Sequence, residues 1–308
     1  MEQEAMVAAT LVIFLREGIE ASMIIAILLA YLDRIGQRRH FADVIAGVAV
    51  ALVLALGGGL AAYYTIRSYD GSRVQTIFET CTFLVAAAVL TYMTFWMRNH
   101  SRTFSAELRA KTEAALDSGA RRGLFLLAFQ AVGREGLETV VFTLAVVFST
   151  SAEGAVLGAA IGLALALALA FAIYRLGTHV NIGLFFKIVG ALLMVFAAGL
   201  LVDAVENLQS LGWLPLLTHP MWNSAHALSE GSALGDIVHS FFGYVSRPTP
   251  MELVTWVLYV GIVLSAFLGL WHRLLRKHVP ALVHRADSGH ADRAERADLP
   301  GGGSERPS

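Results

Sequence analysis

The stretch AMVAATLVIFLREGIEASMIIAILLAY, residues 5–31, decides the fold class of this protein. It is apolar over nearly its whole length, and a helix needs only about 20 such residues to cross a bilayer core about 30 Å thick. Charged residues interrupt it at Arg16-Glu17-Gly18-Ile19-Glu20, near the middle of the stretch. The acidic N-terminus lacks the basic region of a signal peptide, so we predict an uncleaved membrane helix with charges near the bilayer centre.

Six further segments have comparable length and apolar character. The seven predicted spans are residues 5–31, 43–66, 76–97, 123–149, 154–174, 183–209 and 251–272. The composition agrees, because 56% of the residues are hydrophobic and 15% are charged, whereas soluble domains carry about 25% charged residues. We therefore predict an all-α integral membrane protein with about seven transmembrane helices. The formal net charge of −1 gives no reason to expect nucleic acid as a partner.

The distribution of Lys and Arg predicts the orientation, since cytoplasmic loops are enriched in these residues. Thirteen of them flank one side of the predicted spans and three flank the other side. This bias places the N-terminus outside and the C-terminus in the cytoplasm, in an inner or plasma membrane. The predicted organisation is a seven-helix domain over residues 1–272, with an outer loop at 210–250. A polar cytoplasmic tail follows at 273–308, and its composition is typical of disorder.

The charged group of the first span is repeated in the fourth as Arg134-Glu135-Gly136-Leu137-Glu138. Three spans separate the two copies, so the helices that carry them run in opposite directions. This pattern predicts an inverted repeat of three plus three helices, over about residues 5–97 and 123–209, with the seventh helix outside it. Many secondary transporters have this architecture and bind their substrate near the midplane between the halves.

The six charged residues of the two motifs are Arg16, Glu17, Glu20, Arg134, Glu135 and Glu138. An ionised residue at the bilayer centre costs about 2.5–3.5 kcal/mol on insertion scales, so we expect all six to face the protein interior. Within each motif the spacings i,i+3 and i,i+4 put the charged side chains on one side of the helix.

If the two motifs face each other, four carboxylates meet two guanidinium groups, and the surplus negative charge needs a multivalent cation or partial protonation. The ligand atoms are all oxygen, which suits Fe³⁺, Mn²⁺, Ca²⁺ or Mg²⁺ and does not by itself select iron.

Other interpretations of the same residues predict different functions. Arg–Glu pairs can simply lock two helices together, as in a seven-helix receptor or membrane scaffold with a structural polar core. A proton-coupled transporter would use the same glutamates without a metal. The chain has no H-E-x-x-H and no G-x-S-x-G motif, so we do not expect an enzyme.

The paired R-E-x-x-E motifs resemble those of the oxidase-dependent iron permeases, which include the fungal high-affinity iron permease and the EfeU-type membrane subunit of the bacterial elemental-ferrous-iron uptake system. The similarity extends over about residues 1–272. It includes Thr91-Tyr92-Met93-Thr94-Phe95-Trp96-Met97, Ala197-Ala198-Gly199-Leu200 and the run Trp222, Ser224, Leu228-Ser229, Gly235, Phe242-Gly243-Tyr244 and Arg247-Pro248.

The resemblance implies import of iron as the transported substrate, with no permanently bound cofactor. Its implied ligands are Glu17, Glu20, Glu135 and Glu138, with Arg16 and Arg134 as counter-charges. It also implies that Fe²⁺ is oxidised outside by a ferroxidase or peroxidase partner, with an iron-binding partner, before Fe³⁺ is handed over. The alternative substrates are other multivalent cations, such as Mn²⁺ or Pb²⁺.

Three acidic residues near the outer ends of predicted spans are secondary candidates. Glu79 lies near the start of the third span, where a relay role competes with simple stabilisation of a helix N-terminus. Asp203 and Glu206 are spaced i,i+3 near the end of the sixth span, where a carboxylate is unfavourable for the helix dipole. We therefore consider this pair a relay or a point where metal enters.

Overall fold

The computed structural model is helical, with no strand among the residues that it describes. These are residues 2–100, 103–117, 119–149, 152–176, 182–226, 228–229, 232, 235, 238–239 and 242–268. The chain divides into two compact units, Met1–Leu264 and Ser265–Ser308. In the second unit the described part is the single short helix α10 (Ser265–Leu268). The fold and the site described below belong to the first unit.

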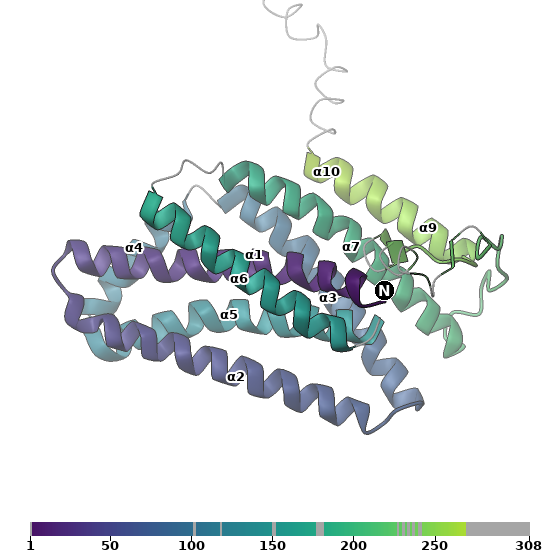
Figure 1. The fold of residues 1–308 in the computed structure, drawn as a ribbon, viewed down its shortest axis with the longest axis horizontal. Helices are drawn as coiled ribbons and strands as arrows, with labels where there is room; N and C mark the ends of the chain where they lie inside the picture. Colours follow the sequence, from purple (N-terminus) through teal and green to yellow (C-terminus); the bar gives the residue numbers. More distant parts are fainter. Residues whose placement is uncertain are drawn as a thin grey trace, which may run out of the picture. The chain divides into compact units, whose positions relative to one another are not determined.

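The first unit is built from long helices, of which α1, α5 and α2 run side by side while α6 crosses α1 (Figure 1). The helices are α1 (Glu2–Arg34), α2 (Phe41–Arg67), α3 (Arg73–His100), α4 (Phe104–Asp117), α5 (Ala120–Ser149), α6 (Ala152–Leu176), α7 (Ile182–Ser210) and α9 (Pro250–Tyr259). A 3₁₀ turn, Arg38–His40, precedes α2, and a π-helical turn, Val260–Leu264, follows α9.

Each of the predicted spans coincides with helix in the residues that are described. Four helical segments there are long and apolar enough to cross a membrane: Arg38–Arg67, Arg73–Arg98, Lys187–Ser210 and Pro250–Leu268. Helices α1 and α5 carry the charged motifs in their middle. The number of crossings and the orientation stay predictions, and the polar tail at 273–308 lies outside the described residues.

Helix α4 was not predicted, because its sequence was assigned to a polar loop between two spans. It is amphipathic: Leu108, Thr112 and Ala115 are buried, while most of its other described side chains are exposed. The buried side packs against α5 and α1. The spacing of these three residues at i, i+4 and i+7 was the available signal for such a helix.

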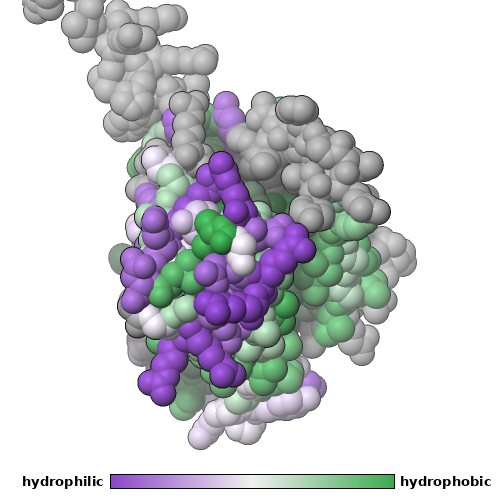
Figure 2. Space-filling view, turned by 90° about the vertical axis from the view of Figure 1, so that its left-hand side faces the viewer, coloured by the Kyte–Doolittle hydropathy of each residue, from purple (hydrophilic) through white to green (hydrophobic). Residues whose placement is uncertain are grey.

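The surface of the first unit is hydrophilic at one end and apolar on the flank formed by α2. Figure 2 shows that the end formed by the α1–α2 turn, α4 and the beginning of α5 is largely hydrophilic. Its exposed basic residues are Arg34, Arg38, Arg39, Arg109, Lys111, Arg121 and Arg122. On the flank, α2 exposes a run of apolar side chains, with Val53 and Leu56 each 67% exposed. Such a run is stable in lipid and unfavourable in water.

The helices of the two predicted halves pair reciprocally. α1 makes its most extensive contact with α6, and α5 makes its most extensive contact with α2. The remaining large contact joins α3 to α7. Exchanging the first three of these helices with α5, α6 and α7 therefore reproduces the main pattern of packing, as two structurally equivalent halves related by a pseudo-two-fold axis would require.

Close helix contacts at glycine show the same reciprocity residue by residue. A Cβ atom at Gly158 of α6 would lie 2.3 Å from the carbonyl oxygen of Val7, and one at Gly47 of α2 would lie 2.4 Å from that of Phe125. Val7 and Phe125 occupy the same place ahead of the motifs in α1 and α5. Only glycine permits such an approach of two backbones, so both crossings depend on the missing side chain.

Glycines inside the motifs repeat the relation. A Cβ at Gly18 would lie 2.7 Å from the Cβ of Ala166 in α6, and a Cβ at Gly136 would lie 2.9 Å from that of Ala55 in α2. Ala166 follows Gly158 at the same interval by which Ala55 follows Gly47. Both motifs are therefore held against the partner half in one register.

Two hydrophobic clusters fill the first unit, and the charged motifs lie between them along α1 and α5. The charged layer is the name used here for Arg16, Glu17, Glu20, Arg134, Glu135 and Glu138. The first cluster includes Ala9, Ile13, Phe83, Leu90, Phe142, Val146, Leu193 and Leu200. The second includes Ile24, Leu28, Leu32, Val44, Leu108, Leu124, Ala128 and Val132. On both helices the motif separates residues of one cluster from residues of the other, so apolar packing closes the charged layer on both sides.

Candidate metal centre

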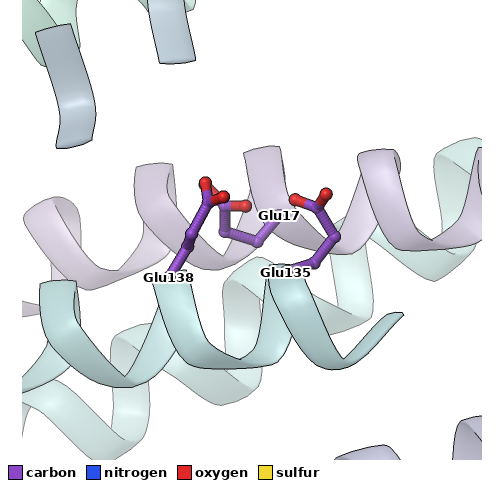
Figure 3. A group of neighbouring side chains, drawn as sticks. All are labelled: Glu17, Glu135 and Glu138. Atoms are coloured by element: carbon purple, nitrogen blue, oxygen red, sulfur yellow. The ribbon is translucent and has the colours of Figure 1, made fainter. Parts of the chain in front are cut away.

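Three carboxylates converge where α1 and α5 face each other. Glu17 extends from α1, and Glu135 and Glu138 extend from consecutive turns of α5 (Figure 3). One oxygen of each lies within 4.8 Å of the others. Glu17 and Glu135 are buried and Glu138 is nearly so. This separation lets a single cation bind all three oxygens after small side-chain adjustments, because carboxylate–metal distances are about 2.0–2.6 Å.

The arginine of the first motif is enclosed by the glutamates of its own helix. Its Nη1 donates to Oε1 of Glu17 at 2.7 Å, and its Nε lies 3.1 Å from Oε1 of Glu20. The side chain of Arg16 is only 3% exposed. Two carboxylates thus share one guanidinium in a buried place, where the opposite charges offset the cost of desolvation.

The arginine of the second motif has different surroundings. Nε of Arg134 donates to Oε1 of Glu138 at 2.9 Å, while Nη2 donates to the Sδ of Met93 on α3. The guanidinium carbon lies 5.0 Å from the centre of the Trp96 ring, also on α3. The Arg134 side chain is 44% exposed, so the prediction that all six charged residues face the protein interior is wrong for this residue. The same sequence motif therefore holds its positive charge inside the layer in one copy and at its edge in the other.

The charged layer retains unused binding capacity. Buried side-chain atoms without a hydrogen-bond partner among the described residues are Arg16 Nη2, Glu17 Oε2, Glu20 Oε1, Glu135 Oε2 and Glu138 Oε2. Leaving such atoms unsatisfied costs about 1–3 kcal/mol each, and more for charged groups. Two arginines cannot balance four glutamates, so a cation bound by the carboxylate oxygens would satisfy those oxygens and the charge deficit, whereas Nη2 of Arg16 is a donor and needs an acceptor.

The structure brings together three of the four glutamates predicted as ligands. Glu17, Glu135 and Glu138 form the three-carboxylate group, and Glu20 lies beside Arg16 instead. Their roles as metal ligands stay predictions, as do those of Arg16 and Arg134 as counter-charges.

The secondary candidates lie elsewhere, on α3 and α7. Glu79 accepts a hydrogen bond from Nε2 of Gln75 at 2.8 Å. Oδ1 of Asp203 lies 3.9 Å from Nε2 of His239, a residue of the predicted outer loop at 210–250. Glu206 lines an open pocket of about 680 Å³ together with Gln209, Ser246, Thr249 and Glu252. A relay or capture role for these residues stays a prediction.

Sequence reasoning missed the neighbours that come from other helices. Trp96 and Met93 touch Arg134 from α3, and no local sequence pattern predicts such a contact. Glu252 was also missed, although the sequence Thr249-Pro-Met-Glu252 has the capping-box pattern. The structure confirms that cap: Thr249 accepts from the Glu252 amide, and Glu252 accepts from the Thr249 amide. Its carboxylate therefore stabilises the beginning of α9.

Comparison with known proteins agrees with this architecture. Residues 7–279 match the sequence model of the Iron permease FTR1 family. The ferrous iron permease EfeU of Escherichia coli O6:K15:H31 (strain 536 / UPEC) is 34% identical over 257 residues, which cover 83% of this chain and 93% of that protein. The EfeU proteins of Shigella sonnei (strain Ss046) and Yersinia pestis have the same identity over the same length. No solved structure matches the chain.

These relatives and the long apolar helices identify a multi-pass protein of the inner membrane. The family match extends over most of the chain, including both charged motifs and the helices that pack against them. The chain therefore belongs to the Iron permease FTR1 family.

Proposed function

We propose that this protein imports iron across the inner membrane and that iron passes over the carboxylates of Glu17, Glu135 and Glu138. The observation that carries the proposal is the convergence of these three side chains, with free buried oxygens, between α1 and α5, the helices that carry the two motifs. Relatives named as ferrous iron permeases support iron as the cargo. Glu20 completes the set of acidic residues by holding Arg16 against the first motif.

Electrostatics explains why a multivalent cation would enter this layer. Four glutamates and two arginines leave a deficit of positive charge in a place with low dielectric constant, where attraction between opposite charges is strong. A hydrated ion that exchanges water for carboxylate oxygens would therefore be bound there despite its own cost of desolvation. The oxygen ligands accept Mn²⁺ as well as iron, so competition with Mn²⁺ during uptake measures how far the site itself selects iron.

The two hydrophobic clusters give the transport cycle its two barriers. The first cluster closes the charged layer on the side of Ile13 and Phe142, and the second closes it on the side of Leu28 and Leu124. Alternating access then consists of loosening one cluster while the other stays packed. Reciprocal pairing of α1 with α6 and α5 with α2 supports an inverted repeat in which the two halves rock against each other.

Delivery of iron belongs to a partner in this proposal. The chain has one cysteine, Cys81, and no C-x-x-C-H haem-attachment sequence with which it could oxidise Fe²⁺. An extracytoplasmic ferroxidase or peroxidase would supply Fe³⁺, and Asp203, Glu206 and Glu79 would then receive the ion or relay it. Oxidation of Fe²⁺ by the purified protein alone would contradict this part of the proposal.

The test is uptake of ⁵⁵Fe by cells that lack their own iron importers and express the protein or a variant at matched membrane levels. Glu138→Gln and Glu17→Gln each remove a charged ligand with little change in size, so uptake should fall to background. Glu113→Gln on α4 provides a matched control, because Glu113 is exposed and outside the charged layer. Normal uptake by both ligand variants would favour a structural polar core as in a scaffold, and would refute the glutamate route.

A further inference from the structure

The guanidinium groups of the two arginines lie in different positions relative to the glutamates of their motifs, although the two motifs have the same charged residues at the same spacing. Arg16 contacts both glutamates of its motif, through Nη1 and Nε. Arg134 has glutamates at the same sequence positions, Glu135 and Glu138, but the ion pair that it forms is with Glu138. Because the spacing is identical, the local geometry of α5 would also allow Arg134 to contact both of its glutamates.

Helix α3 accounts for the difference. The Trp96 ring lies 5.0 Å from the guanidinium carbon of Arg134, within the distance at which an indole attracts a cation. Sδ of Met93, on the same side of α3, accepts a hydrogen bond from Nη2. Met93 is 1% exposed, so this contact is fixed within the packed helices. The attraction to the Trp96 ring draws the guanidinium toward α3, where Met93 also touches it, and away from the space between Glu17 and Glu135.

That space matters because the three converging carboxylates adjoin it. A guanidinium that bridged Glu135 and Glu138 would occupy the oxygens that face Glu17, as Arg16 occupies oxygens of Glu17 and Glu20 in the first motif. Iron would then compete with an arginine for these oxygens. A guanidinium held at the edge of the layer still supplies positive charge to Glu138 while it leaves Glu135 available.

We propose that Trp96 is a positioning residue that holds Arg134 at the edge of the charged layer, so that Glu135 and Glu138 stay available to iron. This inference rests on the proposed function of the glutamates. It predicts that loss of the aromatic ring weakens iron binding without removing any ligand. The effect should therefore appear in the iron concentration that gives half-maximal uptake, and much less in the maximal rate.

A graded series of ⁵⁵Fe uptake measurements tests the role of the ring. Trp96→Tyr and Trp96→Phe keep an aromatic face that attracts a cation more weakly than indole, and Trp96→Leu removes it. The KM for uptake should rise from Trp to Tyr or Phe and again to Leu, reaching about fivefold to thirtyfold above wild type for Leu. Tyr92→Leu, one turn earlier on α3 and 63% exposed, is the matched control for loss of an aromatic residue from this helix.

A double variant separates positioning from a general packing defect. In the Arg134→Gln background there is no guanidinium for Trp96 to hold. Adding Trp96→Leu should therefore leave the KM for uptake within about twofold of the Arg134→Gln value. In the wild-type background the same substitution should raise KM about fivefold or more. An equal rise in KM in both backgrounds would overturn the proposal, and so would an unchanged KM in the whole Trp96 series. If Trp96→Leu does not reach the membrane, the Tyr and Phe variants decide the same question.

Glu138→Gln, measured in the same cells, distinguishes failure of the proposed role of Trp96 from failure of the proposed glutamate route. If Glu138→Gln abolishes uptake while the Trp96 series has no effect, the inference about Trp96 fails and the glutamate route stands. If Glu138→Gln takes up iron normally, the proposed function itself fails, whatever the Trp96 variants do.

Discussion

The two R-E-x-x-E motifs have the same charged residues at the same spacing, but Arg16 is 3% exposed and Arg134 is 44% exposed. The first arginine is surrounded by its own glutamates, and the second is divided between Glu138 and the α3 residues Met93 and Trp96. A repeated sequence thus produces two motifs with different surroundings. The first motif is a closed ion-pair cluster that contributes Glu17, and the second contributes two available carboxylates.

The glycine contacts show where the two halves are alike. Crossings at Gly47 and Gly158, and again at Gly18 and Gly136, repeat the same approach with exchanged partners. The backbones of the two predicted halves therefore approach each other alike at these four glycines, and the difference between the motifs arises in the side chains around the arginines.

The largest difference is expected between the two arginines. Arg16→Gln leaves two carboxylates buried without their counter-charge, which typically destabilises a protein by about 3–5 kcal/mol. Arg134→Gln removes a side chain that is 44% exposed and has an ion pair with one carboxylate, Glu138, so the loss of stability should be smaller than for Arg16→Gln. Unfolding of the purified protein in mixed detergent micelles measures both free energies. Equal destabilisation by the two substitutions would show that the two motifs have equivalent surroundings.

A smaller and symmetrical effect is expected at the closest crossings. Gly158→Ala would bring a methyl group to 2.3 Å from the Val7 carbonyl oxygen, and Gly47→Ala would bring one to 2.4 Å from that of Phe125. Because backbone atoms have to move, each substitution should lower the free energy of unfolding by about 1–3 kcal/mol. The same unfolding assay applies. A large effect at one position with none at the other would argue against equivalent halves.

Alanine in place of a motif glycine should destabilise the protein less than alanine at the closest crossings. A second substitution at the contacting residue should restore the lost stability. Gly18→Ala creates a conflict with the Cβ of Ala166, and Gly136→Ala creates one with the Cβ of Ala55. Each should destabilise by about 1 kcal/mol. Ala166→Gly should restore only the first variant and Ala55→Gly only the second, as judged by unfolding and by ⁵⁵Fe uptake. Restoration by the wrong partner would contradict the contacts.

The smallest effect is expected at a glycine of α2 that faces open space. A Cβ at Gly57 meets no atom within 4 Å. Alanine has the higher helix propensity, so Gly57→Ala should stabilise the protein by up to about 1 kcal/mol and leave uptake unchanged. This variant is the reference for the crossing glycines. Destabilisation here would indicate a contact on the outer face of α2, such as a second copy of the chain.

Local sequence was sufficient to predict most of the helices and the shared face of the two glutamates on α5. Apolar runs long enough for a bilayer predicted the segments that are helical, and the spacing of Glu135 and Glu138 correctly predicted that they share a face of α5. The amphipathic helix α4 was missed because three buried residues among exposed polar ones give a weak signal beside long apolar spans. Its role is evident only from its packing against α5 and α1.

The sequence by itself determined the apolar lengths, the repeated motif and the surplus of carboxylates, because each of these depends on residues close together in the chain. Only the tertiary structure decided which carboxylates converge and which arginine stays at the edge. Glu17 meets Glu135 and Glu138 across two helices, and Trp96 reaches Arg134 from a third. Such contacts depend on the relative positions of helices distant in sequence, and two identical motifs therefore acquire different neighbours.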